Sequence, residues 1–216
     1  MKLGLVVHAC NLPLEAARIR RSFEALGAET EDVEFCLITE ADYQDDPTKF
    51  NPAAAKNIGI RRLLAAGCDG IVCIDADYIL PPGLFYTLRE EVLQPFHVWV
   101  TRRDCTAHEA RTRDWRRYLT FPIFSDCRGS CNYMSAENWR KVGGWDERTF
   151  GFGGDDDILH YRCWKAEIEK RRIDALPLMH VRHDLRPWSG VNARGKENWE
   201  WHEVEQPNYL TEEAGT

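Results

Sequence analysis

One stretch of the sequence, GIVCIDADYILPPG at residues 70–83, constrains the fold more than any other part of the chain. Residues 71–74 are apolar or carry sulfur, a glycine precedes them, and a Pro-Pro-Gly turn closes the stretch. A short apolar run between turn residues is typical of a buried strand. The sequence therefore predicts a central β-strand at residues 71–75.

Two carboxylates, Asp75 and Asp77, stand at the end of this predicted strand. Side chains alternate along a strand, so both point the same way, and two carboxylates in one place repel each other unless a cation lies between them. The carboxyl ends of the strands are also where open α/β sheets bind ligands. The pair is therefore either a hard-metal site for a phosphate-bearing ligand or two aspartates that begin turns.

The segments before this strand alternate between strand and helix patterns. Strands are expected at residues 3–10 and 33–39, and helices at residues 12–26 and 51–66. The first helix has one apolar stripe with helical spacing, and Asn51-Pro52 provides the second with an N-cap and a first-turn proline. This β-α-β-α-β order predicts a parallel sheet with helices on its faces.

The chain beyond residue 83 is predicted to be less regular. Helices are expected at residues 84–93, 136–142 and 155–171, and strands at residues 96–101, within 122–135 and at 175–181. A chain of 216 residues suits one domain. We expect that domain at residues 1–183, followed by a polar, tryptophan-containing tail at residues 184–216 that either closes over a bound ligand or is pinned to the core.

The composition indicates a globular protein without a broad basic surface. The formal net charge is −7 and 44% of the residues are hydrophobic, which argues against disorder and against a surface that coats nucleic acid. The arginine-rich segment at residues 102–117 is either a solvated helix face or a contact for an anionic acceptor, so a nucleic-acid partner stays open. No transmembrane segment or signal peptide is recognisable, and the eight cysteines are scattered. These features predict a cytoplasmic protein with reduced cysteines.

The second informative stretch is GFGGDDD at residues 151–157. Aspartates in the first turn of a helix cap free N–H groups and oppose the helix dipole, which explains one or two of the three. The glycines allow the backbone to pass close to a ligand, and Phe152 offers an aromatic face to a sugar ring. A carboxylate in this position can also act as a general base.

Two histidines, His180 and His183, follow the last predicted strand. By themselves such histidines are packing or surface residues, but beside a two-aspartate site they are candidate ligands for an ion such as Mn²⁺. Residues three apart lie on opposite faces of a strand, so one ion would not reach both. We favour His183, because it follows the end of the strand.

Together these motifs resemble the GT-A-fold, nucleotide-sugar-dependent glycosyltransferases. The chain is similar to the galactosyltransferase C-terminal type (β-1,4-galactosyltransferase-like) and to bacterial family 2 enzymes. The motifs that carry this resemblance are KFNPAAAKNIG (49–59), IDADYILPPG (74–83), RGSCNYMSAENWRKVGGWDE (128–147), GFGGDDDI (151–158) and MHVRH (179–183). They cover nearly all of residues 3–183, and the resemblance implies an α/β, Rossmann-like GT-A fold with a mixed central sheet.

The resemblance implies a metal-dependent enzyme that uses Mn²⁺ or Mg²⁺. Asp77 would bind the metal, and Asp75 would contact either the metal or the ribose of the nucleotide. His183 would be the more distant metal ligand, with His180 as a second candidate. The expected donor is a nucleotide sugar, most naturally a UDP-sugar.

The remaining site residues also follow from the resemblance. Asp156 would be the catalytic base of an inverting transfer to a hydroxyl group, and Asp155 would grip the acceptor beside Phe152 and Trp145. Phe152 stands where the galactosyltransferases have Trp, and Asp155 stands where they have Glu, so the acceptor is left open. The resemblance places the donor against the following residues: His8, Asn11, Glu40, Asn57, Asp75 and Gly154.

Two other functions compete with transfer of a sugar. A nucleotidyltransferase-type enzyme on a similar fold would need a loop rich in glycine and basic residues after the first strand, and residues 8–11, His-Ala-Cys-Asn, do not supply one. A non-catalytic nucleotide-sugar binding module would bind donor without turnover.

Overall fold

The computed structural model describes residues 1–10, 12–39, 41–43, 51–91, 96–106, 123–124, 131–149, 153–181 and 207–211. For residues 91, 96–104, 123–124 and 174–177 it describes the backbone alone. Within these ranges, no helix has both the length and the apolar character that a bilayer span requires. The cysteines in these ranges are free thiols, and all but Cys36 are buried.

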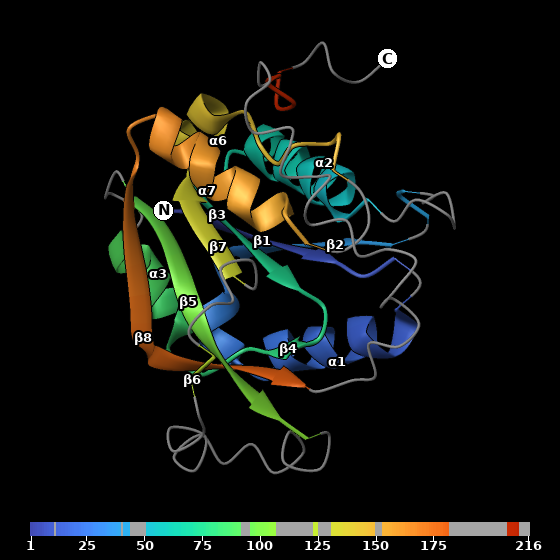
Figure 1. The fold of residues 1–216 in the computed structure, drawn as a ribbon. Helices are drawn as coiled ribbons and strands as arrows, with labels where there is room; N and C mark the ends of the chain where they lie inside the picture. The colour runs from blue at the N-terminus through green and yellow to red at the C-terminus, as the bar shows by residue number, and fades with distance from the viewer. Residues whose placement is uncertain are drawn as a thin grey trace.

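The first half of the chain forms the parallel β-α-β-α-β unit that the sequence predicts (Figure 1). Its elements are β1 (Leu3–His8), α1 (Pro13–Glu24), the 3-10 helix η1 (Gly27–Thr30), β2 (Val33–Ile38), α2 (Pro52–Ala65) and β3 (Gly70–Asp75). Strand β1 lies between β2 and β3 and is parallel to both. The predicted N-cap of α2 is confirmed, because the Asn51 side chain accepts a hydrogen bond from the Ala54 N–H at 3.0 Å.

The second half extends the same sheet with both antiparallel and parallel strand pairs. Its elements are β4 (Tyr78–Ile79), α3 (Leu84–Glu91), β5 (Phe96–Cys105), β6 (Ile123–Phe124), β7 (Cys131–Ser135), α6 (Ala136–Val142), α7 (Asp155–Lys165) and β8 (Glu169–Val181). The strand order is β2-β1-β3-β7-β5-β8-β4, with β6 beside β5. Strand β7 runs antiparallel to β3. The predicted α/β fold with a mixed central sheet is therefore confirmed.

Three boundaries differ clearly from the sequence prediction. The strand expected at residues 175–181 begins at Glu169. The helix expected at residues 155–171 ends at Lys165, and Glu167 adopts a positive φ of 54° that turns the chain into β8. The strand expected to end at residue 101 continues to Cys105. These errors have the same physical cause, because long-range pairing of β5 with β8 extends both strands through charged residues that the local pattern assigns elsewhere.

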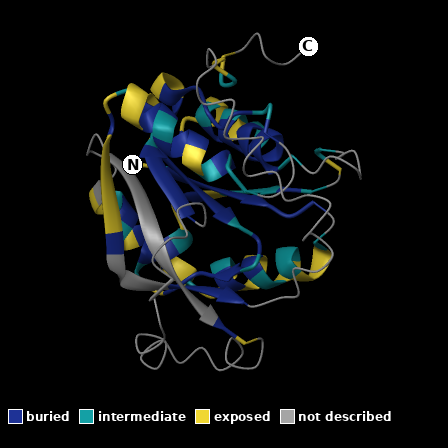
Figure 2. Cartoon of the chain, in the orientation of Figure 1, coloured by how far each residue is buried: buried dark blue, intermediate teal, exposed yellow. Residues whose placement is uncertain are grey.

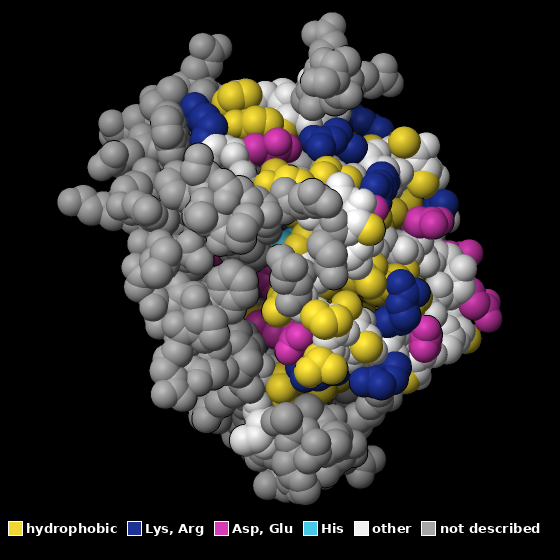
Figure 3. All heavy atoms as spheres, turned by 90° about the vertical axis from the view of Figure 1, so that its right-hand side faces the viewer, with side chains coloured by type: hydrophobic (Ala, Val, Ile, Leu, Met, Phe, Trp, Pro, Cys, Tyr) yellow, Lys and Arg dark blue, Asp and Glu magenta, His cyan; other side chains and the backbone are white. Residues whose placement is uncertain are grey.

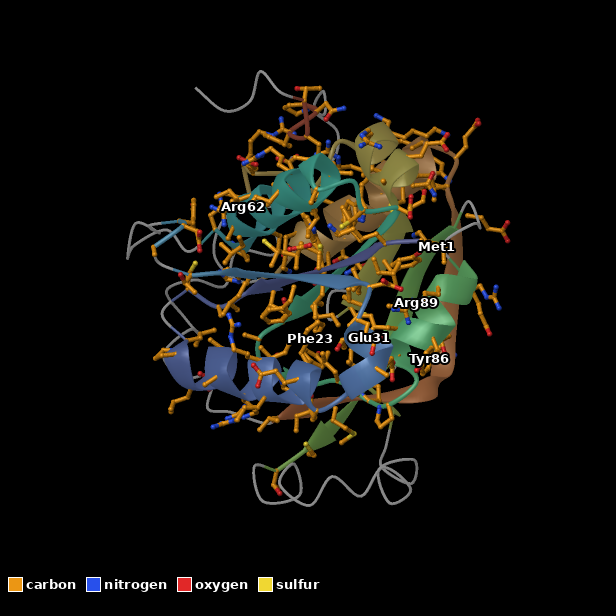
Figure 4. The ribbon with its side chains drawn as sticks, turned by 180° about the vertical axis from the view of Figure 1, so that it is seen from behind. Met1, Phe23, Glu31, Arg62, Tyr86 and Arg89 are labelled. Atoms are coloured by element: carbon orange, nitrogen blue, oxygen red, sulfur yellow. The ribbon has the colours of Figure 1, made fainter. Side chains whose placement is uncertain are left out.

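The sheet separates the two larger hydrophobic cores, and its central strands are buried (Figure 2). Helices α1 and α3 pack on one face, where Phe23 of α1 points toward the sheet (Figure 4) and lies 4.7 Å from Phe35 and 5.9 Å from Phe85 between ring centroids. Helices α2, α6 and α7 cover the other face (Figure 1). Because residues alternate along β1 and β3, the side chains of His8 and Asp75 lie on the α2 side of the sheet.

Helix α2 lies unusually close to β1. A Cβ atom on Gly59 would lie 2.5 Å from Cγ1 of Val6, so only glycine fits at this contact. The amino-terminal half of the helix is accordingly small and buried, with Ala53, Ala54 and Ala55 in its first turns. This close approach brings polar residues of α2 over the carboxyl ends of the central strands.

Candidate active site

The candidate site lies at the carboxyl ends of β1 and β3. His8 and Asp75 are direct neighbours in the register of these two strands. Figure 3 looks onto the side toward which β3 runs in Figure 1, and it shows acidic side chains recessed near the middle of that side. A shallow depression lined by Met1, Lys2 and residues 31–34 lies at the opposite, amino-terminal end of the strands (Figure 4) and contains none of the candidate residues.

A buried lysine, Lys56 of α2, lies at the centre of this site. Its Nζ is 3.1 Å from Oδ1 of Asp75 and 4.3 Å from the centroid of the Trp145 ring, and the residue is 4% exposed. Burial opposes the charged form, but the charges of the surrounding aspartates outweigh burial and raise the pKa of Lys56 above its ordinary value. Lys56 is therefore positively charged near neutral pH. The sequence analysis did not single out this residue, because a lysine within a helix ordinarily faces solvent.

Two aspartates from the start of α7 share this environment. Asp155 and Asp156 both interact electrostatically with the Lys56 ammonium group. Gly153 and Gly154, with φ values of 97° and 86°, form the turn that places Asp155 and Asp156 in the first helical turn. The structure thus brings together the strand-end and helix-start acidic motifs that the sequence treats separately, and Lys56 lies between them.

Asp156 has one carboxylate oxygen in a buried position without a hydrogen-bond donor among the described residues. Its Oδ1 is buried and accepts no hydrogen bond within the described parts of the chain. Burial and the neighbouring charge of Asp155 raise the pKa of Asp156 well above its usual value, although Lys56 opposes this shift. A carboxylate with raised proton affinity has the property that a general base near neutral pH requires.

Asp77 and His180 form the second part of the site. Nε2 of His180 lies 3.0 Å from Oδ2 of Asp77, and His180 is held by pairing of β8 with Tyr78 of β4. One imidazole nitrogen beside carboxylate oxygens suits Mn²⁺ or a similar ion. This donor set therefore fits the metal that the sequence implies, although no cluster of three or more His, Cys, Asp or Glu side chains is arranged around one metal position within the described ranges.

Asp75 interacts both with Lys56 and with Asp77. Its contact with Lys56 ties it to α2, while Asp77 and Asp155 contribute repulsion. Crowding by protein and the charge of Asp77 raise the pKa of Asp75 above its ordinary value, and Lys56 opposes this effect. The first aspartate of the DxD motif therefore has a protein cation as its partner in this structure.

His8 lies beside Asp75 as a neutral histidine. Burial first, and the charge of Lys56 second, lower the pKa of His8 to about 3. The imidazole ring is therefore uncharged near neutral pH. A neutral imidazole ring carries one hydrogen-bond donor and one acceptor.

Two of the predicted ligand-binding residues are bound to each other. Asn57 is fully buried, donates from Nδ2 to the Trp145 carbonyl at 2.9 Å and accepts from the Trp145 N–H at 2.9 Å. Trp145 is also fully buried and packs beneath Lys56, and its expected contact with the acceptor stays a prediction. Asn57, expected at the donor, holds the loop after α6 in place.

The loop that contains Trp145 is braced by the C-terminal segment 207–211. Tyr209 donates from its hydroxyl to Asp146 at 3.0 Å and from its N–H to Gly143 at 2.9 Å, and Arg162 of α7 donates to the carbonyl groups of Val142 and Pro207. Burial opposes ionisation of Asp146, but hydrogen bonds from Arg148 and Tyr209 outweigh it and lower the pKa of Asp146.

Four of the predicted site residues are outside the described part of the chain. They are Asn11, Glu40, Phe152 and His183. Their proposed contacts with the donor, the acceptor and the metal stay predictions.

This combination of sheet order, strand-end aspartates and helix-start aspartates belongs to a GT-A fold, the fold of nucleotide-sugar glycosyltransferases. The comparisons with known proteins confirm the resemblance recognised in the sequence. A family model described as the N-terminal domain of galactosyltransferase matches residues 118–184. A comparison with curated protein sequences gives no significant match.

Several solved glycosyltransferase structures share the fold at low sequence identity. The catalytic domain of Drosophila β1,4-galactosyltransferase 7, solved with xylobiose, is 15% identical, with a TM-score of 0.66 over 95% of this chain and 80% of that one. The Pyrobaculum calidifontis mannosyltransferase PcManGT, solved with GDP-Man and Mn²⁺, is 10% identical, with a TM-score of 0.58 over 97% of this chain and 67% of that one. TarS of S. aureus is 7% identical, with a TM-score of 0.61 over 84% of this chain and 37% of that one.

Proposed function

We propose that this protein is a metal-dependent, inverting glycosyltransferase that moves a sugar from a nucleoside-diphosphate donor to a hydroxyl group. The observation that carries the proposal is the meeting of two acidic elements at one edge of the sheet, with Asp75 and Asp77 at the end of β3 and Asp155 and Asp156 at the start of α7. Transfer of a sugar needs both elements, because charge develops on the leaving group and on the acceptor at once.

Asp77 and His180 are the described residues that would hold the metal. A divalent ion bound there would neutralise the growing negative charge of the nucleoside diphosphate as it leaves. The similar structures that were solved with Mn²⁺ contain UDP-Gal or GDP-Man. These examples support a nucleotide-sugar donor and make UDP-sugars and GDP-sugars the first to test.

Asp156 would act as the base. In the proposed reaction, the acceptor oxygen forms a bond to the anomeric carbon, the bond from that carbon to the diphosphate oxygen breaks, and the hydroxyl proton passes to the Asp156 carboxylate. The carboxylate has to be ionised before each turnover, and the nearby Lys56 ammonium group favours that form. The neutral His8 ring at the end of β1 would contribute hydrogen bonds to the nucleotide without adding charge.

The test is a screen for donor hydrolysis. Purified protein with Mn²⁺ is incubated with a panel of UDP- and GDP-sugars, and release of nucleoside diphosphate is followed. We expect one donor to be used, with activity abolished in Asp77→Ala and reduced about 10²–10⁴-fold in Asp156→Asn. Asp157→Asn is the matched control, because Asp157 stands in the same helical turn but is exposed.

Each alternative has its own outcome in this screen. Donor binding by thermal shift without diphosphate release, with Asp156→Asn equal to wild type, would favour a non-catalytic binding module. Release of inorganic pyrophosphate from nucleoside triphosphates would favour a nucleotidyltransferase. Absence of binding to every donor would reject the site.

A further inference from the structure

Lys56 is a buried cation with several fixed contacts. Its ammonium group is bonded to Asp75 at 3.1 Å and lies above the Trp145 ring at 4.3 Å. Burial of a charge is unfavourable unless opposite charges and good geometry compensate for it. In this structure the compensation comes from the acidic side chains of the candidate site and from the aromatic ring.

The surroundings of Lys56 hold it in one place. The next residue, Asn57, exchanges two hydrogen bonds with the backbone of Trp145, so the ring beneath Lys56 is fixed to the same helix as Lys56 itself. Helix α2 is in turn pressed against β1 at Gly59, where no larger residue fits. The ammonium group is therefore pre-organised and needs no rearrangement to reach Asp75.

We infer that Lys56 is a positioning residue of the proposed transferase site. Lys56 occupies one oxygen of Asp75 and offsets the charge of Asp155 and Asp156, so that a single divalent ion binds at Asp77 and His180 and not at Asp75. The inference rests on the proposed function. It assigns different partners to the two aspartates of the DxD motif: a protein cation to the first and a metal ion to the second.

The charge balance explains why such a cation is useful. Four carboxylates gather in this site, at positions 75, 77, 155 and 156. Without a fixed cation, the repulsion among them would be relieved by recruiting more than one ion from solution. The Lys56 ammonium group supplies one positive charge to the part of the site near α7. The part near β4 and β8, which contains Asp77 and His180, is then left for the metal that binds the donor diphosphate.

The direct test measures Mn²⁺ binding by electron paramagnetic resonance, with and without UDP. Wild-type protein should bind one Mn²⁺. Lys56→Met keeps the length of the side chain and removes the charge, so it should bind Mn²⁺ about tenfold more tightly or bind a second ion. Lys56→Arg should restore a single ion. Lys2→Met is the matched control, because Lys2 forms an exposed ion pair with Glu34 at 3.0 Å far from the site.

Kinetics separate a positioning role from a structural one. With the donor that the hydrolysis screen identifies, Lys56→Met should lower kcat by about 10–100-fold with less than about a threefold change in the donor KM, and Lys56→Arg should recover part of kcat. If Lys56→Met matches wild type in Mn²⁺ affinity, stoichiometry and kcat, the inference is wrong.

A second variant keeps the test decisive if Lys56→Met does not fold. Asp75→Asn in the wild-type background should change Mn²⁺ affinity by less than about threefold, because Lys56 already occupies Asp75, whereas loss of a metal ligand would weaken binding by about tenfold or more. The weaker binding would overturn the inference. If wild-type protein uses no donor, the proposed function fails, but the Mn²⁺ titrations still decide the role of Lys56.

Discussion

Replacement of Asn57 by leucine should destabilise the protein strongly, although the residue lies beside a candidate ligand site. The side chain is fully buried and makes hydrogen bonds of 2.9 Å to the Trp145 N–H, the Trp145 carbonyl and the Glu147 carboxylate. Leucine has a similar volume but leaves both backbone groups of Trp145 buried without these partners. Each such group costs about 1–3 kcal/mol, whereas Glu147 keeps its contact with Arg61 at 3.2 Å.

The net loss should be about 3 kcal/mol, because the added apolar burial of leucine offsets part of the polar penalty. For a chain of this size, that corresponds to a fall in Tm of roughly 6–12 °C. Urea unfolding followed by tryptophan fluorescence, together with thermal unfolding, measures both values. Asn208→Ala is the control, because the Asn208 side chain is exposed and donates to the Arg140 carbonyl at 3.1 Å. Its loss should be less than about 1 kcal/mol.

The same variant tests the alternative role of Asn57. If Asn57 contacts the donor, as the family resemblance implies, Asn57→Leu should raise the donor KM while Tm changes little. A Tm within about 2 °C of wild type would therefore refute the bracing role. A large fall in Tm together with an unchanged KM in the folded fraction would support it.

Three further predictions concern the Asp156 carboxyl group and the C-terminal segment 207–211. Burial and the charge of Asp155 raise the pKa of Asp156, so the acid limb of the pH–rate profile should lie at a higher pH than an ordinary carboxyl group would give. This limb should move to lower pH in Asp155→Asn, and a limb that does not move would contradict the prediction. The raised pKa also means that the folded state holds the proton more tightly, so the contribution of Asp156 to stability is complete below its unfolded pKa and lost as pH rises through its folded pKa. Asp156→Asn should therefore have a Tm advantage over wild type at pH 8 that disappears at pH 4, and an equal advantage at both would refute it. Truncation after residue 206 removes the partners that segment 207–211 gives to Arg162 and Asp146 and should lower stability by roughly 3 kcal/mol in urea unfolding. An unchanged unfolding midpoint would contradict this bracing role.

The regular elements near the start of the chain were predictable because local and long-range preferences agree there. The apolar run at residues 71–74 is central in the sheet, and the Asn51-Pro52 cap begins α2 as expected. At the junction of α7 and β8, local sequence preference and long-range strand pairing favour different structures. Residues 169–171 carry no strong strand pattern, and they become a strand because β5 offers hydrogen-bonding groups along that edge.

The residues of the candidate site were likewise predictable only in part from the sequence. The sequence marks Asp75, Asp77, Asp155 and Asp156, because carboxylates that follow an apolar strand or a glycine-rich turn are candidates for a ligand site. It also marks His180, although the preference went to His183, which lies outside the described residues.

What the sequence determined by itself was therefore the parallel sheet, the acidic motifs at two element ends and the resemblance to GT-A enzymes, since each depends on residues close together in the chain. Only the tertiary structure decided that Lys56 and Asn57 turn inward. Their orientation depends on the close approach of α2 to β1 and on the Trp145 loop, nearly 90 residues away. The first turn of α2 consists of small residues, Pro52 to Ala55, so it does not show which face will be buried, and the structure buries the face that carries Lys56 and Asn57.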